Sequence, residues 1–479
     1  MSEGFNIDDL PEELLLHIFT LIAADREPDY RPSSLCIPVN LLSLSLTCKL
    51  FNRLATPLLA YRWSNVSGHC PNEYLASFLE HLVKNPSQQN RVREAALFTD
   101  EYDGIHHKSL TDIAGPLFPI AKQFPGPTYA EIINAIASEQ AVDALLSLVL
   151  ELIPRIQLLE LNIDSLQSYT LSVFEHAVKE INKRKNIDSS LHLSDVQLPP
   201  FIFLKRIIMY QSPKIRGDNY LNISYVSIFF HLPNLRGFYG YGLPVLGLEA
   251  ARFPADGSSA VESIVLMNCA IDDPAITLLF GACKALRKLV LTMDDTGPWR
   301  EFHFTSKAIG EGVARHATSL QELTINSKWS RQVHTDDAPM ESIGSGLIPL
   351  ENLQFLDIGS EVLFGRTSYS DYTDRLPPEC SFVDVLPVSL ERLELNSDDL
   401  GDDRQFDIIV AALRYFLDNC GKNKKFPSLK YLIVSQWLWE NADTSDDINE
   451  LDRACVTAGV ELLRHESNRR LLFDFIKYD

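Results

Sequence analysis

The chain has 479 residues, of which 46% are hydrophobic and 22% charged, and its formal net charge at pH 7 is −21. A chain of this length is too long to fold around a single hydrophobic core, so it predicts several domains or an extended repeat architecture. No window holds the roughly eighteen apolar residues that a membrane span needs, and acidic chains disfavour nucleic acid, whose binding depends on clustered Lys and Arg. We therefore expect neither a membrane nor a nucleic acid as partner.

The amino-terminal segment MSEGFNIDDL has no basic region and no long apolar stretch, so it predicts no secretory signal. Eight cysteines are scattered without a C-x-x-C pair, which is typical of reduced thiols. These features predict a cytoplasmic and/or nuclear location.

The first predicted element is an amphipathic helix that opens at Leu10 and Pro11. Proline suits the first helical position, and the two glutamates that follow favour the positive end of the helix dipole. The apolar residues then recur at helical spacing: Leu14, Leu15, Ile18, Phe19 and Ile22.

A second leucine-rich block runs over residues 41–63, with the sequence LLSLSLTCKLFNRLATPLLAYRW. Helices this short cannot bury so many large side chains among themselves, so a surplus should face another protein or the next domain. From periodicity alone, a docking module and an amino-terminal cap of a repeat protein explain the leucines equally well.

The two blocks together resemble the F-box, through LPEELLLHIF at Leu10–Phe19 and LTCKLFNRLATPLLAYRW at Leu46–Trp63. The segment AADREPDYRPSSLCIPV between the first two helices is longer than this family usually has. The resemblance implies a three-helix module that binds the Skp-type adaptor of a cullin-RING ubiquitin ligase. It assigns adaptor binding to Leu10, Pro11, Leu14, Ile18, Leu42, Cys48, Lys49 and Phe51.

Beyond Trp63, a pattern of apolar-x-x-apolar-x-apolar recurs along the chain. Its last two positions alternate as in a short strand with one buried face, and helical stretches lie between the instances. The clear instances are Ile156/Leu159/Leu161, Val261/Ile264/Leu266, Leu286/Leu289/Leu291, Leu320/Leu323/Ile325, Leu353/Leu356/Ile358, Leu390/Leu393/Leu395 and Leu429/Leu432/Val434, and weaker ones are Val92/Ala95/Leu97, Leu204/Ile207/Met209 and Leu235/Phe238. A strand and a helix, repeated, predict a solenoid.

This body resembles leucine-rich repeats of the cysteine-containing type that accompany F-boxes, best in SIVLMNCAIDD and ACKALRKLVL. The predicted fold class is α/β: a three-helix F-box followed by an irregular leucine-rich-repeat solenoid with parallel strands inside and helices outside. We expect the F-box over residues 1–63, a linking helical segment over 64–90, the solenoid over 91–463 and a carboxyl-terminal cap over 464–479. A last helix should end at Gly459, before a last strand over residues 460–463.

Side chains that alternate with the buried strand leucines should face the concave wall, where we expect a target protein to bind. Aromatic and charged side chains favour interfaces. The candidate substrate-binding residues are Tyr210, Tyr239, Tyr241, Lys288, Glu322, Trp329, Asp357, Arg392, Tyr431 and Trp437.

Catalytic patterns are weak in this sequence. His106 and His107 lie near acidic residues but lack the i, i+4 spacing of a zinc site. Walker-type, G-x-G-x-x-G and G-x-S-x-G motifs are absent from the sequence. We therefore expect no enzyme activity, no metal and no cofactor.

The resemblance implies a substrate-recognition adaptor of an SCF-type ligase that brings a target protein to the ubiquitin-charged enzyme. An alternative is a scaffold that binds partners through the solenoid without ubiquitin transfer. A receptor that needs a small molecule to grip its target is a third hypothesis. The sequence does not separate these three.

Overall fold

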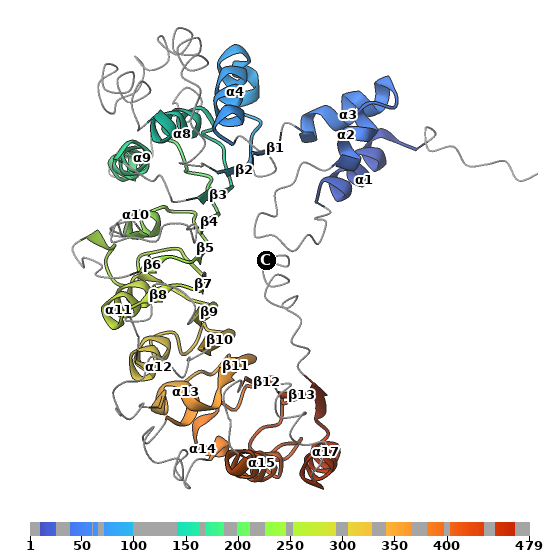
Figure 1. Ribbon diagram of the computed structural model, residues 1–479, viewed down its shortest axis with the longest axis vertical. Helices are drawn as coiled ribbons and strands as arrows, with labels where there is room; N and C mark the ends of the chain where they lie inside the picture. Colours follow the sequence, from blue (N-terminus) through green and yellow to red (C-terminus); the bar gives the residue numbers. More distant parts are fainter. Residues whose placement is uncertain are drawn as a thin grey trace, which may run out of the picture. The chain divides into compact units, whose positions relative to one another are not determined.

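The computed structural model describes residues 10–24, 39–59, 61–65, 71–98, 141–162, 168–185, 199–210, 226–245, 252–293, 305–327, 342–365, 381–396, 403–434 and 446–464 (Figure 1). The chain divides into two compact units, residues 1–212 (unit 1) and residues 213–479 (unit 2).

Unit 1 begins with a helical module and continues into a parallel sheet. Its elements are α1 (Glu12–Ala24), α2 (Val39–Ser45), α3 (Lys49–Leu59), β1 (Arg62–Ser64), α4 (Pro71–Lys84), α5 (Pro86–Gln89), β2 (Glu94–Leu97), α8 (Ala141–Leu152), β3 (Leu158–Asn162), α9 (Ser168–Lys185) and β4 (Arg206–Tyr210). The strands pair in the order β1-β2-β3-β4, and every pairing is parallel.

Unit 2 repeats the same strand-and-helix arrangement. Its elements are α10 (Val226–Phe230), β5 (Gly237–Tyr241), β6 (Pro244–Val245), β7 (Ser263–Met267), β8 (Ala270–Ile271), α11 (Asp273–Ala282), β9 (Lys288–Met293), α12 (Ser306–Ala314), β10 (Glu322–Ser327), η4 (Gly344–Leu347), β11 (Phe355–Gly359), α13 (Ser360–Phe364), α14 (Phe382–Val385), β12 (Arg392–Asn396), α15 (Asp403–Leu417), β13 (Tyr431–Val434), α17 (Asp446–Ala458) and β14 (Glu461–Arg464). The main sheet runs β5-β7-β9-β10-β11-β12-β13-β14, and β6 pairs with β8 in a small second sheet.

The strand register aligns the apolar residues of successive repeats. Leu289, Leu323, Leu356 and Leu393 are partners on neighbouring strands, and each is 0% exposed. Within each unit the helices lie along one side of the strands (Figure 1). The two layers confirm the predicted solenoid with strands inside and helices outside, because one repeat buries its edge against the next.

Cys269 stabilises the turn that follows β7. Its thiol lies 3.4 Å from the carbonyl oxygen of Gly240 and 3.3 Å from that of Met267, and it accepts the amide of Leu243 at 3.4 Å. Burial raises the pKa of this thiol to about 12, so it stays protonated and can donate. Cys269 thus ties the turn of one repeat to the backbone of the previous one.

The carboxyl-terminal elements follow the sequence prediction. Helix α17 ends at Ala458, Gly459 adopts a φ of +72°, and β14 follows. Glycine adopts this left-handed conformation without steric cost, which explains the stop. The expected cap over residues 464–479 lies outside the described residues, apart from Arg464 at the end of β14.

In the described part of the chain, no helix combines the length and the apolar composition that crossing a bilayer requires.

Candidate functional site

The helical module has a small core of its own. Leu15, Phe19, Leu41, Phe51 and Ala55 are nearly fully buried. The rings of Phe19 and Phe51 meet edge to face, with centroids 5.1 Å apart and an interplanar angle of 88°. This geometry is favourable for aromatic pairs, so α1 and α3 are held together at this contact.

Several large leucines of the module remain exposed to solvent. They lie on α1, on α2 and just after α2: Leu14 (50% exposed), Leu16 (42%), Leu21 (56%), Leu42 (45%) and Leu46 (78%). Leu14 and Leu21 are seven residues apart and share one side of α1. Concentrated exposure of leucine in so short a segment is typical of a protein-binding surface.

The predicted adaptor-binding residues fall into three groups by exposure. Pro11, Leu14, Leu42, Cys48 and Lys49 are exposed, Leu10 and Ile18 are half-buried, and Phe51 is 6% exposed. Phe51 therefore supports α1 from within the core, whereas the exposed residues can contact a partner directly.

Cys48 has a structural role at the start of α3. Its sulfur accepts the amide of Phe51 at 3.4 Å, and its carbonyl accepts the amide of Asn52 at 2.9 Å. This sulfur occupies the place of an N-cap acceptor. Arg53 of α3 also pairs with Glu12 of α1, which adds an exposed contact between these two helices.

The second candidate site is the strand face of unit 2 that points away from the leucines. Residues at the first position of each strand align across the sheet: Ser263, Lys288, Glu322, Phe355, Arg392, Tyr431 and Glu461. Tyr239 and Asp357 belong to the row two residues further on, and Tyr241 to the next row. The structure thus brings seven predicted substrate-binding residues, Tyr239, Tyr241, Lys288, Glu322, Asp357, Arg392 and Tyr431, onto one face.

Side chains on this face are held by one another. Lys288 lies 3.2 Å from Glu322, and Arg392 lies 3.2 Å from Glu394. The guanidinium carbon of Arg392 also stands 4.9 Å from the centroid of the Phe355 ring, within the range of a cation–π contact. Asn396 donates its amide to Asp357.

Exposure separates the predicted residues further. Tyr431 is 38% exposed, and Glu322 and Arg392 are half-buried. Tyr239, Lys288 and Asp357 are largely buried, at 2%, 6% and 8%. Burial raises the pKa of the half-buried Tyr241 above its ordinary value, with a smaller contribution from Cys269. Tyr431 is therefore the predicted residue on this face that is most available to a partner, followed by the half-buried Arg392, Glu322 and Tyr241.

Three predicted residues do not join this group. Tyr210 belongs to β4 of unit 1, where it is buried beside Phe98 with ring centroids 5.6 Å apart. Trp329 and Trp437 lie outside the described residues.

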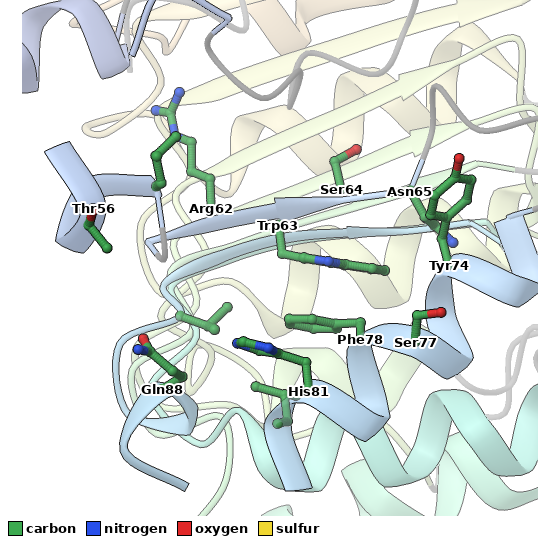
Figure 2. A pocket seen from close by; sticks show the side chains of 13 residues that line it. Thr56, Arg62, Trp63, Ser64, Asn65, Tyr74, Ser77, Phe78, His81 and Gln88 are labelled. Carbon is green, nitrogen blue, oxygen red and sulfur yellow. The ribbon is translucent and has the colours of Figure 1, made fainter. Parts of the chain in front are cut away.

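Unit 1 also contains a pocket of about 620 Å³, lined by residues of α3, β1, α4 and the segment after α4. Figure 2 shows the ring of Trp63 lying flat over that of Phe78, with centroids 3.9 Å apart and an interplanar angle of 9°. Arg62 at one end is paired with Glu94 at 2.6 Å. The sequence prediction missed this pocket because it counted Trp63 with the helical module, whereas Trp63 lies in β1.

The described residues could support chemistry through metal ligands or through reactive thiols. They contain no cluster of three His, Cys, Asp or Glu side chains arranged to hold a metal. Burial raises the pKa values of Cys269, Cys283, Cys420 and Cys455 to about 12. These thiols are protonated near neutral pH and therefore poor nucleophiles.

Two family models match the chain. Residues 135–445 match the leucine-rich repeat domain, and residues 7–64 match the F-box-like domain. No curated protein matches it. The two matched segments correspond to the solenoid repeats and to the helical module with its exposed leucines.

Proposed function

Because this chain belongs to the leucine-rich repeat family and carries an F-box-like domain near its amino terminus, we propose that it is a substrate-recognition adaptor of an SCF-type cullin-RING ubiquitin ligase. In this proposal the F-box-like helices dock on a Skp-type adaptor and the solenoid binds a target protein. The chain itself supplies position and orientation, and ubiquitin transfer is carried out by its partners.

The observation that carries the proposal is the exposure of leucines over the F-box-like core. Leu14, Leu42 and Lys49 belong to the residues that the family resemblance assigns to adaptor binding, and all three are exposed. Exposed leucines lose contact with water when a partner covers them, which contributes about 25 cal/mol per Å² of apolar surface. A core that holds α1 and α3 in fixed geometry lowers the cost of ordering this surface on binding.

Target binding is supported by the chemistry of the unit 2 strand face. Tyr431, Arg392 and Glu322 belong to one row of the sheet and are exposed or half-buried, and Phe355 of the same row lies against the guanidinium of Arg392. Tyr and Arg on a preorganised surface are the side chains that dominate protein interfaces.

The decisive experiment is a pull-down of the purified full chain with a Skp-type adaptor and cullin. Leu14→Asp combined with Leu42→Asp places charges on the exposed leucine surface, and we expect adaptor affinity to fall at least about tenfold. Val456→Asp is the matched control, because Val456 is 73% exposed on α17 of unit 2. Its adaptor affinity should equal that of the wild type.

Unchanged adaptor binding in the double variant would refute this docking surface. Adaptor binding without cullin recruitment would favour the scaffold alternative instead. Faster turnover of a protein that the wild-type chain binds, and normal turnover with the double variant, is the result expected of a ligase adaptor.

A further inference from the structure

Within each unit, the residues directly before the strands form a line along the sheet, which we call the strand-start rim. In unit 1 the rim residues are Tyr61, Arg93, Gln157 and Lys205, and in unit 2 they include Arg236, Glu262, Arg287, Glu391 and Lys430. Backbone hydrogen bonds join successive rim residues: Gln157 donates to Arg93 at 2.6 Å and Lys205 donates to Gln157 at 2.8 Å. The side chains of neighbouring rim positions are therefore about 4.8 Å apart at their base.

In unit 2, carboxylates neutralise the basic residues of the rim. Glu262 accepts from Arg236 at 2.7 Å and lies 3.6 Å from Arg287. Lys430 lies 2.5 Å from Glu391, whose hydrogen bond raises the pKa of the lysine. The basic side chains of these unit 2 rim positions are thus paired with carboxylates of the same rim.

In unit 1 two of the four rim positions are basic, and they have no acidic partner among the described residues. Arg93 and Lys205 occupy the rim, and Arg91, Arg155 and Arg206 lie within two residues of a rim position in sequence. None of these five side chains forms an ion pair in the part of the chain that the structure describes. The guanidinium of Arg93 donates to the backbone carbonyls of Asn90 and Val92.

Two of these cations lie close enough to repel each other. Burial lowers the pKa of Arg93, and the positive charge of Arg155 lowers it further. Glu94, the acidic residue that directly follows Arg93, is already paired with Arg62 at 2.6 Å. A chain with a net charge of −21 therefore maintains a local excess of positive charge beside β2, β3 and β4, which Figure 1 shows as adjacent strands.

We propose that Arg93, Arg155 and Lys205 bind an acidic segment of the target protein, with phosphorylated side chains as its preferred form. This inference rests on the proposed role of the solenoid in holding a target. Guanidinium groups bind phosphate in bidentate geometry, which suits a site built mainly from arginines.

The size of the patch favours a short peptide over a nucleic acid or a membrane. Screening limits the influence of distant charges to about 8 Å at physiological salt, so a short segment meets mainly the basic patch. An extended polyanion would also meet the acidic remainder of the chain. Two rim spacings across β2–β4 span about 10 Å, which is the length of about three residues of extended chain. The preferred ligand therefore carries two anionic residues three positions apart.

Fluorescence anisotropy of the full chain with labelled peptides tests this proposal. The probe has two phosphoserines three residues apart in an alanine-glycine background, and matched peptides carry glutamate or serine at both positions. The combined variant R93Q/R155Q/K205Q should bind the phosphopeptide at least about tenfold more weakly, because three charge-assisted contacts are lost. The combined variant R236Q/R287Q/K430Q removes the same charge from ion-paired rim positions and should bind within about twofold of the wild type.

The expected order of affinity is phosphoserine, then glutamate, then serine. Equal losses in the two triple variants would show a diffuse charge effect and overturn the proposal, as would failure of the wild type to bind the phosphopeptide. Tighter binding of a single-stranded RNA or of phosphatidylserine vesicles, lost in the unit 1 variant, would also overturn it. If the triple variant melts early, R155Q/K205Q removes two exposed side chains and should still weaken binding several-fold.

The adaptor pull-down separates this proposal from the proposed function. A wild-type chain that binds the Skp-type adaptor but not the phosphopeptide refutes the rim site alone. A chain that binds the phosphopeptide but no adaptor refutes the ligase role and leaves the anion site in place.

Discussion

His316 connects three elements of unit 2 through its two ring nitrogens. Its Nδ1 accepts the amide of Leu286, just before β9, at 3.4 Å, and its Nε2 lies 3.0 Å from the carbonyl of Phe280 in α11. One nitrogen accepts and the other donates, so the ring must be neutral. Burial lowers the pKa of His316 below its ordinary value of 6.5, and the charge of Arg315 lowers it further.

A pH-dependent stability follows from this environment. The neutral form is favoured in the folded chain, so the stabilisation is fully present above pH 6.5 and is lost as the pH falls towards the lower folded pKa. We expect His316→Gln to reduce the melting temperature at pH 7.5, and the difference from the wild type to shrink by pH 5.5. His17→Gln is the control, because His17 is exposed. A melting-temperature difference between His316→Gln and the wild type that stays constant over this pH range would contradict the neutral ring of His316.

For Tyr239, the sequence predicted the face of the sheet but not the burial of the side chain. Its position beside the apolar Phe238 of the repeat pattern placed it on the recognition face, and in the structure it lies in the same row as Val265 of β7. A Cβ at Gly237 would meet the Tyr239 ring at 2.6 Å, so this ring lies over the space that the glycine leaves. Alternation along a strand determines on which face of the sheet a side chain lies. Its exposure depends in addition on which neighbouring side chains are small.

At the scale of elements, the repeat pattern predicted the strands well because it records burial directly. The apolar pairs Leu289/Leu291 and Leu356/Ile358 lie in β9 and β11 and are at most 2% exposed. Strand β1 was not predicted, since its three residues are all half-buried and show no alternation. The two-residue strands β6 and β8 are too short for any period to appear.

Close helix packing was another feature that the sequence did not reveal. Gly310 in α12 and Gly346 in η4 bring two backbones together: a Cβ at Gly346 would lie 2.5 Å from the Cα of Gly310. A Cβ at Gly310 would lie 2.3 Å from the carbonyl oxygen of Ile343. Backbone atoms cannot rotate away as a side chain can, so this contact requires glycine.

Gly310→Ala should therefore destabilise the chain, although alanine favours helix by up to about 1 kcal/mol. We expect a net loss of roughly 1–3 kcal/mol from overpacking, seen as a lower calorimetric melting temperature. Gly281→Ala in α11 is the matched control, because the added Cβ meets mainly the ends of the Arg315 and Asp256 side chains. An equal effect of the two substitutions would show that the close backbone approach at Gly310 does not set the cost.

At the scale of the molecule, the chain is stabilised by successive contacts between neighbouring repeats. In unit 2 each inner strand pairs with one strand on either side, as β11 pairs with β10 and β12. Solenoid stability is approximately a sum over such neighbours. The effect of a substitution should therefore depend on its position along the sheet as well as on the burial of its side chain.

Leu356→Ala in β11 tests this dependence against Leu462→Ala in β14. Leu356 is 0% exposed with leucines on both sides, Leu323 and Leu393, so its truncation should cost roughly 2–5 kcal/mol. Leu462 is half-buried and, among the described strands, pairs only with β13, so we expect a cost of about 1 kcal/mol. Amide hydrogen exchange should rise across β10, β11 and β12 in the first variant, because the loss of one inner repeat removes two interfaces. In the second variant the rise should stay within β14 and its neighbour, and equally wide exchange in the two variants would show that unit 2 unfolds as one cooperative block.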